Sequence, residues 1–114
     1  MLQLNHKKLN AWVKSIELVK AIYSLTISFP KEELYGLTSQ LRRASVSVPS
    51  NIAEGSSRKS KSERSRFYEI ARSSLVEIDT QIVISMELGY LRNDDITELE
   101  QLANEIFAML SAMK

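Results

Sequence analysis

The sequence contains no cysteine and a single histidine, His6. Without cysteine the chain can form neither a disulfide scaffold nor a thiolate metal site, and it has no cysteine nucleophile. One histidine cannot supply the ligands of a histidine-based metal site, and it precedes the first predicted helix, where it is no base for a Ser-His-Asp triad. Glycine-rich phosphate-binding loops are also absent. We therefore expect a protein that is not an enzyme and that holds no cofactor and no metal.

Glycine occurs three times and proline twice. A many-stranded β fold needs a turn about every ten residues, so this scarcity argues against one. A chain of 114 residues corresponds to one domain, spanning residues 1–114, with a core of ordinary size. Apolar residues make up 44% and charged residues 25%, a balance typical of globular proteins rather than disordered ones.

Long apolar runs are missing as well. The longest, Ile106 to Leu110, is far shorter than the roughly 20 residues that a membrane-spanning helix requires. The first residues, MLQLNHKKLNAW, have neither the apolar region nor the small-residue cleavage site of a signal peptide. We expect a soluble, cytoplasmic protein without a membrane partner.

Apolar residues recur at spacings of three and four throughout the chain, which predicts amphipathic helices. Four such patterns follow one another, and no segment is left over for a strand. Leu18, Leu102 and Phe107 fall off the main stripes, so we expect a single bundle to leave them incompletely buried. The four stripes are Leu9, Trp12, Val13, Ile16, Val19, Ile22 and Tyr23; Leu34, Leu37, Leu41, Ala44, Val48 and Ile52; Phe67, Ile70, Ala71, Ser74, Ile78, Ile82, Ser85 and Leu88; and Ile96, Leu99, Ala103, Ile106, Leu110 and Met113.

Capping residues and helix breakers set the boundaries of the first two helices. Asn5 can cap the first helix, which should end near Ser28 because Pro30 disfavours helical geometry in the residue before it. The second runs from about residue 31 to residue 56 and contains Pro49. One kinked helix is favoured over two helices there, and Gly55 is the natural stop.

The third helix opens with Ser60 and Glu63, which have the spacing of a capping box, and ends at Gly89. Asn93 caps the fourth, and two aspartates follow at its positive N-terminal end. The connections between these helices are short, and short connections force neighbouring helices to run antiparallel. The sequence therefore predicts an all-α fold, an antiparallel up-and-down four-helix bundle.

Charge is distributed unevenly along the chain although the net charge is only +1. The balance is +2 over residues 1–41, +5 over residues 42–72 and −6 over residues 73–114. Such asymmetry is typical of surfaces that meet a partner or another copy of the chain. The basic side chains of the middle segment are candidates for binding nucleic-acid phosphates. They are Arg42, Arg43, Arg58, Lys59, Lys61, Arg64, Arg66 and Arg72.

Two hypotheses explain this basic cluster. In the first, it binds RNA or DNA, and Tyr68, which shares a helix face with Arg64 and Arg72, stacks on a base. In the second, the cluster is structural or interfacial, and the protein is a scaffold for a protein partner. Arg58 would then pair with Glu54, Glu69 would pair with Arg66 or Arg72, and Arg42 or Arg43 would face the acidic half of a neighbouring subunit.

The most distinctive part of the sequence is the block LTSQLRRASVSVPSNIAEGSSRKS, residues 37–60. It continues into RFYEIARSSLVEID, residues 66–79, and LGYL, residues 88–91, and Phe29-Pro30 and Tyr35-Gly36 precede it. Together these segments resemble the bacterial four-helix-bundle family named for open reading frames in 23S rRNA intervening sequences, also labelled S23 ribosomal protein. The resemblance covers nearly the whole chain. Val48 stands where the family more often has isoleucine.

The resemblance implies an up-and-down four-helix bundle, which the residues themselves also predict. It further implies a homo-oligomer, with a pentameric ring as the expected form, and no enzymatic activity. Related bundles are accessory proteins of diversity-generating retroelements, in which a basic ring binds nucleic acid and a reverse transcriptase. The ribosomal label reflects gene location rather than membership of the ribosome.

Overall fold

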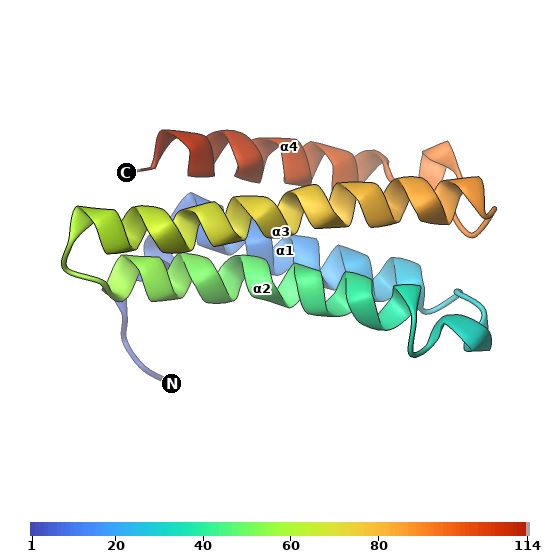
Figure 1. Ribbon diagram of the computed structural model, residues 1–114, viewed down its shortest axis with the longest axis horizontal. Helices are drawn as coiled ribbons and strands as arrows, with labels where there is room; N and C mark the ends of the chain where they lie inside the picture. The colour runs from blue at the N-terminus through green and yellow to red at the C-terminus, as the bar shows by residue number, and fades with distance from the viewer. Residues whose placement is uncertain (114) are drawn as a thin grey trace.

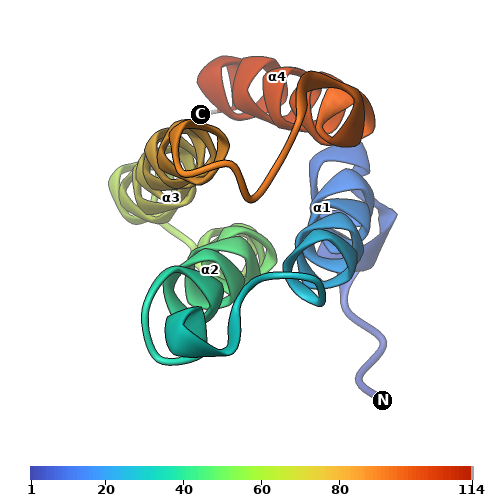
Figure 2. The ribbon, with the colours of Figure 1, turned by 90° about the vertical axis from the view of Figure 1, so that its right-hand side faces the viewer.

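The computed structural model describes residues 1–113, which form four α-helices and no strand. The helices are α1 (Asn10–Thr26), α2 (Leu37–Ser57), α3 (Lys61–Glu87) and α4 (Thr97–Ala112), and short 3-10 turns lie at Asn5–Lys8, Lys31–Glu33 and Asn93–Asp95. The chain runs up and down, and each helix lies beside the next (Figures 1 and 2). The predicted antiparallel four-helix bundle is confirmed. It measures 44 × 26 × 20 Å, and no helix within residues 1–113 is both long and apolar enough to cross a bilayer.

The core lies along the axis between the four helices. The predicted stripes of α2, α3 and α4 are buried at their central positions, while Phe67 is half-buried and Leu34, Ile70 and Leu88, at or near the ends of their stripes, are exposed. The confirmed core positions are Leu41, Ala44, Val48, Ile52, Ala71, Ile78, Ile82, Leu99, Ile106 and Leu110.

The predicted face of α1 is wrong in part: the helix is rotated from the predicted orientation, although Ile22 is buried as predicted. Its buried residues are Ala11, Ser15, Leu18, Ile22 and Thr26, whereas the predicted Val13, Ile16 and Tyr23 are exposed. Apolar residues occupy more than half of the circumference of this helix, so spacing alone cannot tell which face is covered. The small Ala11 and Ser15 let α1 approach the core closely, and the Ser15 hydroxyl donates a hydrogen bond to the Trp12 carbonyl at 2.6 Å.

The expectation for residues off the main stripes is wrong for Leu18 and Leu102 and is confirmed for Phe107. Leu18 and Leu102 are buried in the core, and Phe107 is half-buried against it. A single bundle therefore accommodates Leu18 and Leu102. Helix α1 turns a different edge of its apolar surface inward than predicted, and α4 buries Leu102 in addition to its predicted stripe. On α1, the exposed Val13, Ile16 and Tyr23 belong to the stripe predicted to be inside.

Some of the predicted helix boundaries agree with the structure and others do not. The Ser60 hydroxyl accepts a hydrogen bond from the Glu63 N–H at 3.1 Å, and Gly89 ends α3 with a φ of 82°, as predicted. Asn5 and Asn93 do not cap α1 and α4. Each lies in a 3-10 turn that precedes the helix, so neither is next to the first α-helical residue.

Helix α2 continues through Pro49 as one helix, as favoured above. It begins at Leu37, later than predicted, because residues 31–33 form a separate 3-10 turn and Gly36 has non-helical dihedrals. Gly55 is not the stop, because the helix runs on to Ser57. The glycine instead serves a close contact between helices, described below.

We predict that Ile78→Ala destabilises the fold by about 2–5 kcal/mol, because the side chain is 2% exposed and its loss leaves a cavity. Ile84 is the matched control. It lies on the same helix, is 42% exposed, and its replacement by alanine should change the free energy of unfolding by about 0.5 kcal/mol or less. Chemical denaturation of both variants measures the difference. Equal losses would mean that the core face of α3 is misassigned.

Lys14 of α1 and Glu105 of α4 form an ion pair with 2.6 Å between Nζ and Oε2. The hydrogen bond from Lys14 lowers the pKa of Glu105 below its ordinary 4.5, and the bond from Glu105 raises the pKa of Lys14 above 10.5. The carboxylate therefore stabilises the fold fully above pH 4.5, and this contribution is lost as the pH falls through the lowered pKa. Unfolding measured against pH should show wild type more stable than Glu105→Gln at pH 7, with the difference disappearing in acid. Parallel pH curves would contradict this.

Candidate nucleic-acid interface

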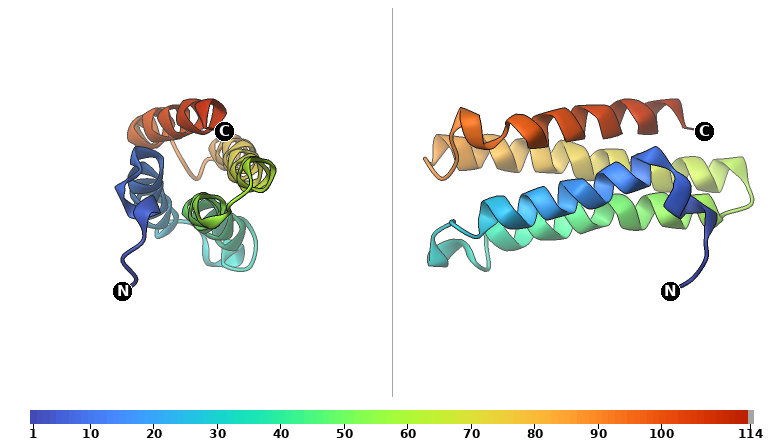
Figure 3. Two further views of the ribbon diagram at one scale, coloured as in Figure 1. Left: turned by 90° about the vertical axis from the view of Figure 1, so that its left-hand side faces the viewer. Right: turned by 180° about the vertical axis from the view of Figure 1, so that it is seen from behind.

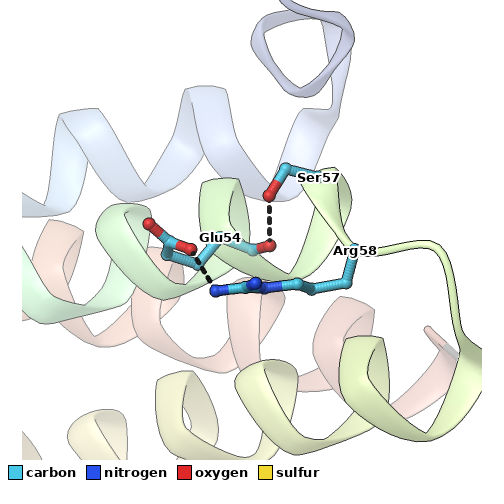
Figure 4. Close-up of polar contacts among 3 residues, drawn as sticks. All are labelled: Glu54, Ser57 and Arg58. Carbon is cyan, nitrogen blue, oxygen red and sulfur yellow. Dashed lines mark hydrogen bonds and ion pairs between the residues drawn. The ribbon is translucent and has the colours of Figure 1, made fainter.

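The connection between α2 and α3 consists of three residues, Arg58 to Ser60, and gathers basic side chains at one end of the bundle. The Arg58 guanidinium folds back along α2 to pair with Glu54 at 3.0 Å, and the Ser57 hydroxyl donates to the Glu54 carbonyl at 2.8 Å (Figure 4). The same guanidinium covers the Phe67 ring, 4.9 Å from its centroid. Arg58 is thus held against the protein, as the structural hypothesis predicted for its pairing with Glu54.

Arg64 closes this turn from the first part of α3. Its Nη1 donates to the backbone carbonyls of Lys59 at 2.6 Å and Arg58 at 3.3 Å. A cation beside the carbonyls that follow a helix C-terminus satisfies their hydrogen-bonding capacity and opposes the negative end of the helix dipole. Arg64 therefore supports the conformation of the turn.

Tyr68 cannot stack on a base as predicted. It is 6% exposed, and its hydroxyl shares a hydrogen bond of 3.1 Å with the Ser56 hydroxyl. Its ring packs on Gly55, where an added Cβ would lie 2.7 Å from the Tyr68 ring. Spacing on one helix face placed Tyr68 beside two arginines, but that face turns toward α2.

Three other predicted arginines, Arg42, Arg43 and Arg72, lie away from the turn. Arg42 donates from Nε to the Thr26 hydroxyl at 2.9 Å and covers the Tyr23 ring, so it joins α2 to α1. Arg72 pairs with Glu69, one of the two pairings considered above, and covers the Phe107 ring of α4. Arg43 is exposed but lies fifteen residues before Arg58, roughly 22 Å along the helix.

Three predicted residues stay exposed at the turn without an ion pair within residues 1–113: Lys59, Lys61 and Arg66. Sequence analysis missed two more at this end, Lys7 and Lys8. They lie in the 3-10 turn before α1, which contacts α2, and the N-terminal segment and the α2–α3 turn lie at the same end (Figures 1 and 3). The antiparallel topology predicted from sequence was the signal that could have placed them there. We call these five residues the basic end.

In the folded bundle, the two halves along the long axis carry net charges of opposite sign. The half that contains the α2–α3 turn, residues 1–18, 47–74 and 105–113, has a net charge of +4. The other half, residues 19–46 and 75–104, has a net charge of −4. The described residues contain no group of three His, Asp or Glu side chains able to hold a metal ion. The chemistry available at the basic end is attraction of anions.

Comparison with known proteins identifies one family. The family model described as 23S rRNA-intervening sequence protein matches residues 7–112. None of the curated proteins matches the chain. The match covers all four helices and both ends of the bundle, so it confirms the resemblance seen in the sequence.

We predict that Gly55→Ala destabilises the protein by about 1–3 kcal/mol, because the new methyl group would overlap the Tyr68 ring. An alanine ordinarily stabilises a helix by up to about 1 kcal/mol relative to glycine, so the sign of the change is diagnostic. Ser57→Ala, two residues on and exposed, is the control and should have little effect. A stabilised Gly55→Ala variant in thermal or chemical unfolding would show that α2 and α3 do not pack this closely.

Proposed function

The chain belongs to the 23S rRNA-intervening sequence protein family, and from this premise we propose that it is a non-enzymatic protein that binds RNA or DNA through its basic end. The observation that carries the proposal is the charge polarity of the folded bundle, +4 in one half and −4 in the other. Exposed lysines and arginines neutralise phosphates and release counterions, which gives affinity without sequence preference.

The basic residues near the α2–α3 turn differ in their contacts, and this difference supports the same function. Arg58 and Arg64 hold the α2–α3 turn in shape, which leaves Lys59, Lys61 and Arg66 to project from a rigid support. A preorganised cation loses less conformational entropy on binding than one on a mobile loop. The acidic half repels the same polyanion, so it favours approach to the basic end.

We further propose that the protein acts as a homo-oligomer, with the pentamer as the form that family resemblance implies. Five cations in one chain give only modest affinity for phosphates. Several chains in one assembly raise the effective concentration of neighbouring basic ends, so that weak contacts add up to useful avidity.

A scaffold role is the second candidate, and a specific observation favours it. Arg42, Arg58, Arg64 and Arg72 all make contacts within the chain, and an apolar stripe of α1 remains exposed. On this alternative the exposed surfaces bind protein, either a reverse transcriptase or another partner, and nucleic acid has no role.

The test compares two triple variants that each remove three positive charges. Lys59→Gln, Lys61→Gln and Arg66→Gln neutralise the basic end, whereas Lys31→Gln, Arg43→Gln and Arg92→Gln neutralise exposed cations in the acidic half. We expect wild type to bind RNA and DNA with micromolar affinity, weak sequence preference and a steep salt dependence. The first variant should flatten the slope of log K against log salt by about 2–3, at about 0.7–0.9 for each of three lost contacts, and the second should not.

Fluorescence anisotropy over a salt series measures both slopes. If the two triple variants reduce the slope equally, binding depends on net charge alone, and the basic end is not the binding site. Absence of salt-dependent binding by folded wild type, together with a stable oligomer, would favour the scaffold.

A further inference from the structure

The aromatic rings beside the α2–α3 turn are engaged by other parts of the chain. The Arg58 guanidinium lies over the Phe67 ring, 4.9 Å from its centroid, and Phe67 is half-buried. Tyr68 is buried, with its ring against Gly55. Proteins that bind single-stranded nucleic acid stack successive bases on the open faces of aromatic side chains. These two rings are committed to contacts within the bundle instead.

The other aromatic side chains extend this pattern. Trp12 is half-buried against the core, and its ring lies at 65° to the His6 ring with 5.2 Å between the centroids. Tyr23 lies under the Arg42 guanidinium, 4.6 Å from its ring centroid. Within residues 1–113 the most exposed aromatic side chain is Tyr35, which is 93% exposed. It lies in the connection between α1 and α2, at the opposite end of the bundle from the basic end (Figure 1).

The cations of the basic end form a surface rather than a line. Lys7 and Lys8 lie in the 3-10 turn before α1, and the other three lie in the α2–α3 turn and the first two turns of α3. Lys7 donates one N–H to the Leu2 carbonyl at 2.6 Å, which leaves two for a ligand. Axes of packed helices lie about 8–10 Å apart, so cations on neighbouring helices are separated by a similar distance.

A surface of this kind suits a duplex better than a single strand. It offers positive charge without open aromatic rings, so its affinity depends on the density of phosphates. A duplex has one phosphate charge per roughly 1.7 Å of its axis, about twice the density of one strand. Its two strands are separated by grooves about 6 and 12 Å wide in B-DNA, which is comparable with the separation of neighbouring helices in the bundle.

We propose that the basic end binds double-stranded nucleic acid in preference to a single strand, by contacting the phosphates of both strands. The inference rests on the proposed function and names the class of nucleic acid that the basic end selects. Lysine and arginine contacts to phosphate are available in duplex RNA and duplex DNA alike, so the shared chemistry is that of a paired sugar-phosphate backbone.

The test compares one oligonucleotide alone and paired with its complement, as RNA and as DNA, by fluorescence anisotropy over a salt series. The slopes of log K against log salt should differ by about 0.2 for each phosphate contact, or about 1 for five contacts. Each tenfold decrease in salt should therefore strengthen duplex binding about tenfold relative to the single strand. Tighter binding of only one of the two duplexes would show which helical form fits.

Two aromatic residues provide a readout of stacking. Trp12 is the only tryptophan, so its emission reports one place at the basic end. We expect saturating duplex or single strand to leave that emission nearly unchanged, and Tyr35→Ala to leave both affinities unchanged. Quenching by the single strand, or loss of single-strand binding in Tyr35→Ala, would show base stacking and overturn the inference.

A charge variant tests whether the N-terminal cations belong to the same surface. Lys7→Gln with Lys8→Gln should flatten the duplex slope by about 1.8, at about 0.9 for each contact, whereas Lys31→Gln with Arg43→Gln should not. Both pairs are exposed and remove two positive charges. Equal or tighter binding of the single strand through the basic end would overturn the duplex preference and leave the proposed function standing. Failure of both ligands to bind would overturn the two together.

Discussion

The close approach of α2 and α3 is the constraint on which the rest of the molecule depends. Gly55 has no side chain where the Tyr68 ring packs, and Ser47 and Ser74 share a hydrogen bond of 2.9 Å across the same interface. Two helices that approach this closely can be joined by three residues. A turn this short encloses no core, so its side chains face solvent. The positively charged residues around it therefore stay at the surface, and Arg64 supports the turn by donating to two of its carbonyls.

Arginine and lysine side chains have different roles in this protein. Three arginines each lie over an aromatic ring and also contact an oxygen of another residue: Arg42, Arg58 and Arg72. Their guanidinium groups therefore stabilise contacts between or along helices. The lysines at the α2–α3 turn make no such contacts. This separation follows from side-chain chemistry, because a planar guanidinium stacks and forks whereas an ammonium remains hydrated. It explains how a bundle can have a stable basic region and still present cations to a polyanion.

The surface left uncovered is as informative as the core. Helix α1 buries Leu18 and Ile22 together with small residues, and it leaves Val13, Ile16 and Tyr23 exposed. A mostly apolar groove that Asp79 and Glu100 also line lies between α3 and α4. The basic end lies at one end of the bundle, where the α2–α3 turn is.

The sequence by itself determined the number of helices, their antiparallel order, the Ser60 cap, the Gly89 stop and most of the core of α2, α3 and α4, since periodicity and capping are local properties. It also identified the basic segment at the α2–α3 turn. Only the tertiary structure decided which face of α1 is buried, that Tyr68 packs on Gly55 rather than facing solvent, and which arginines are engaged by other side chains. These outcomes depend on the rotation of each helix about its axis, and that rotation is set by the fit of side chains from other helices, which no local pattern contains.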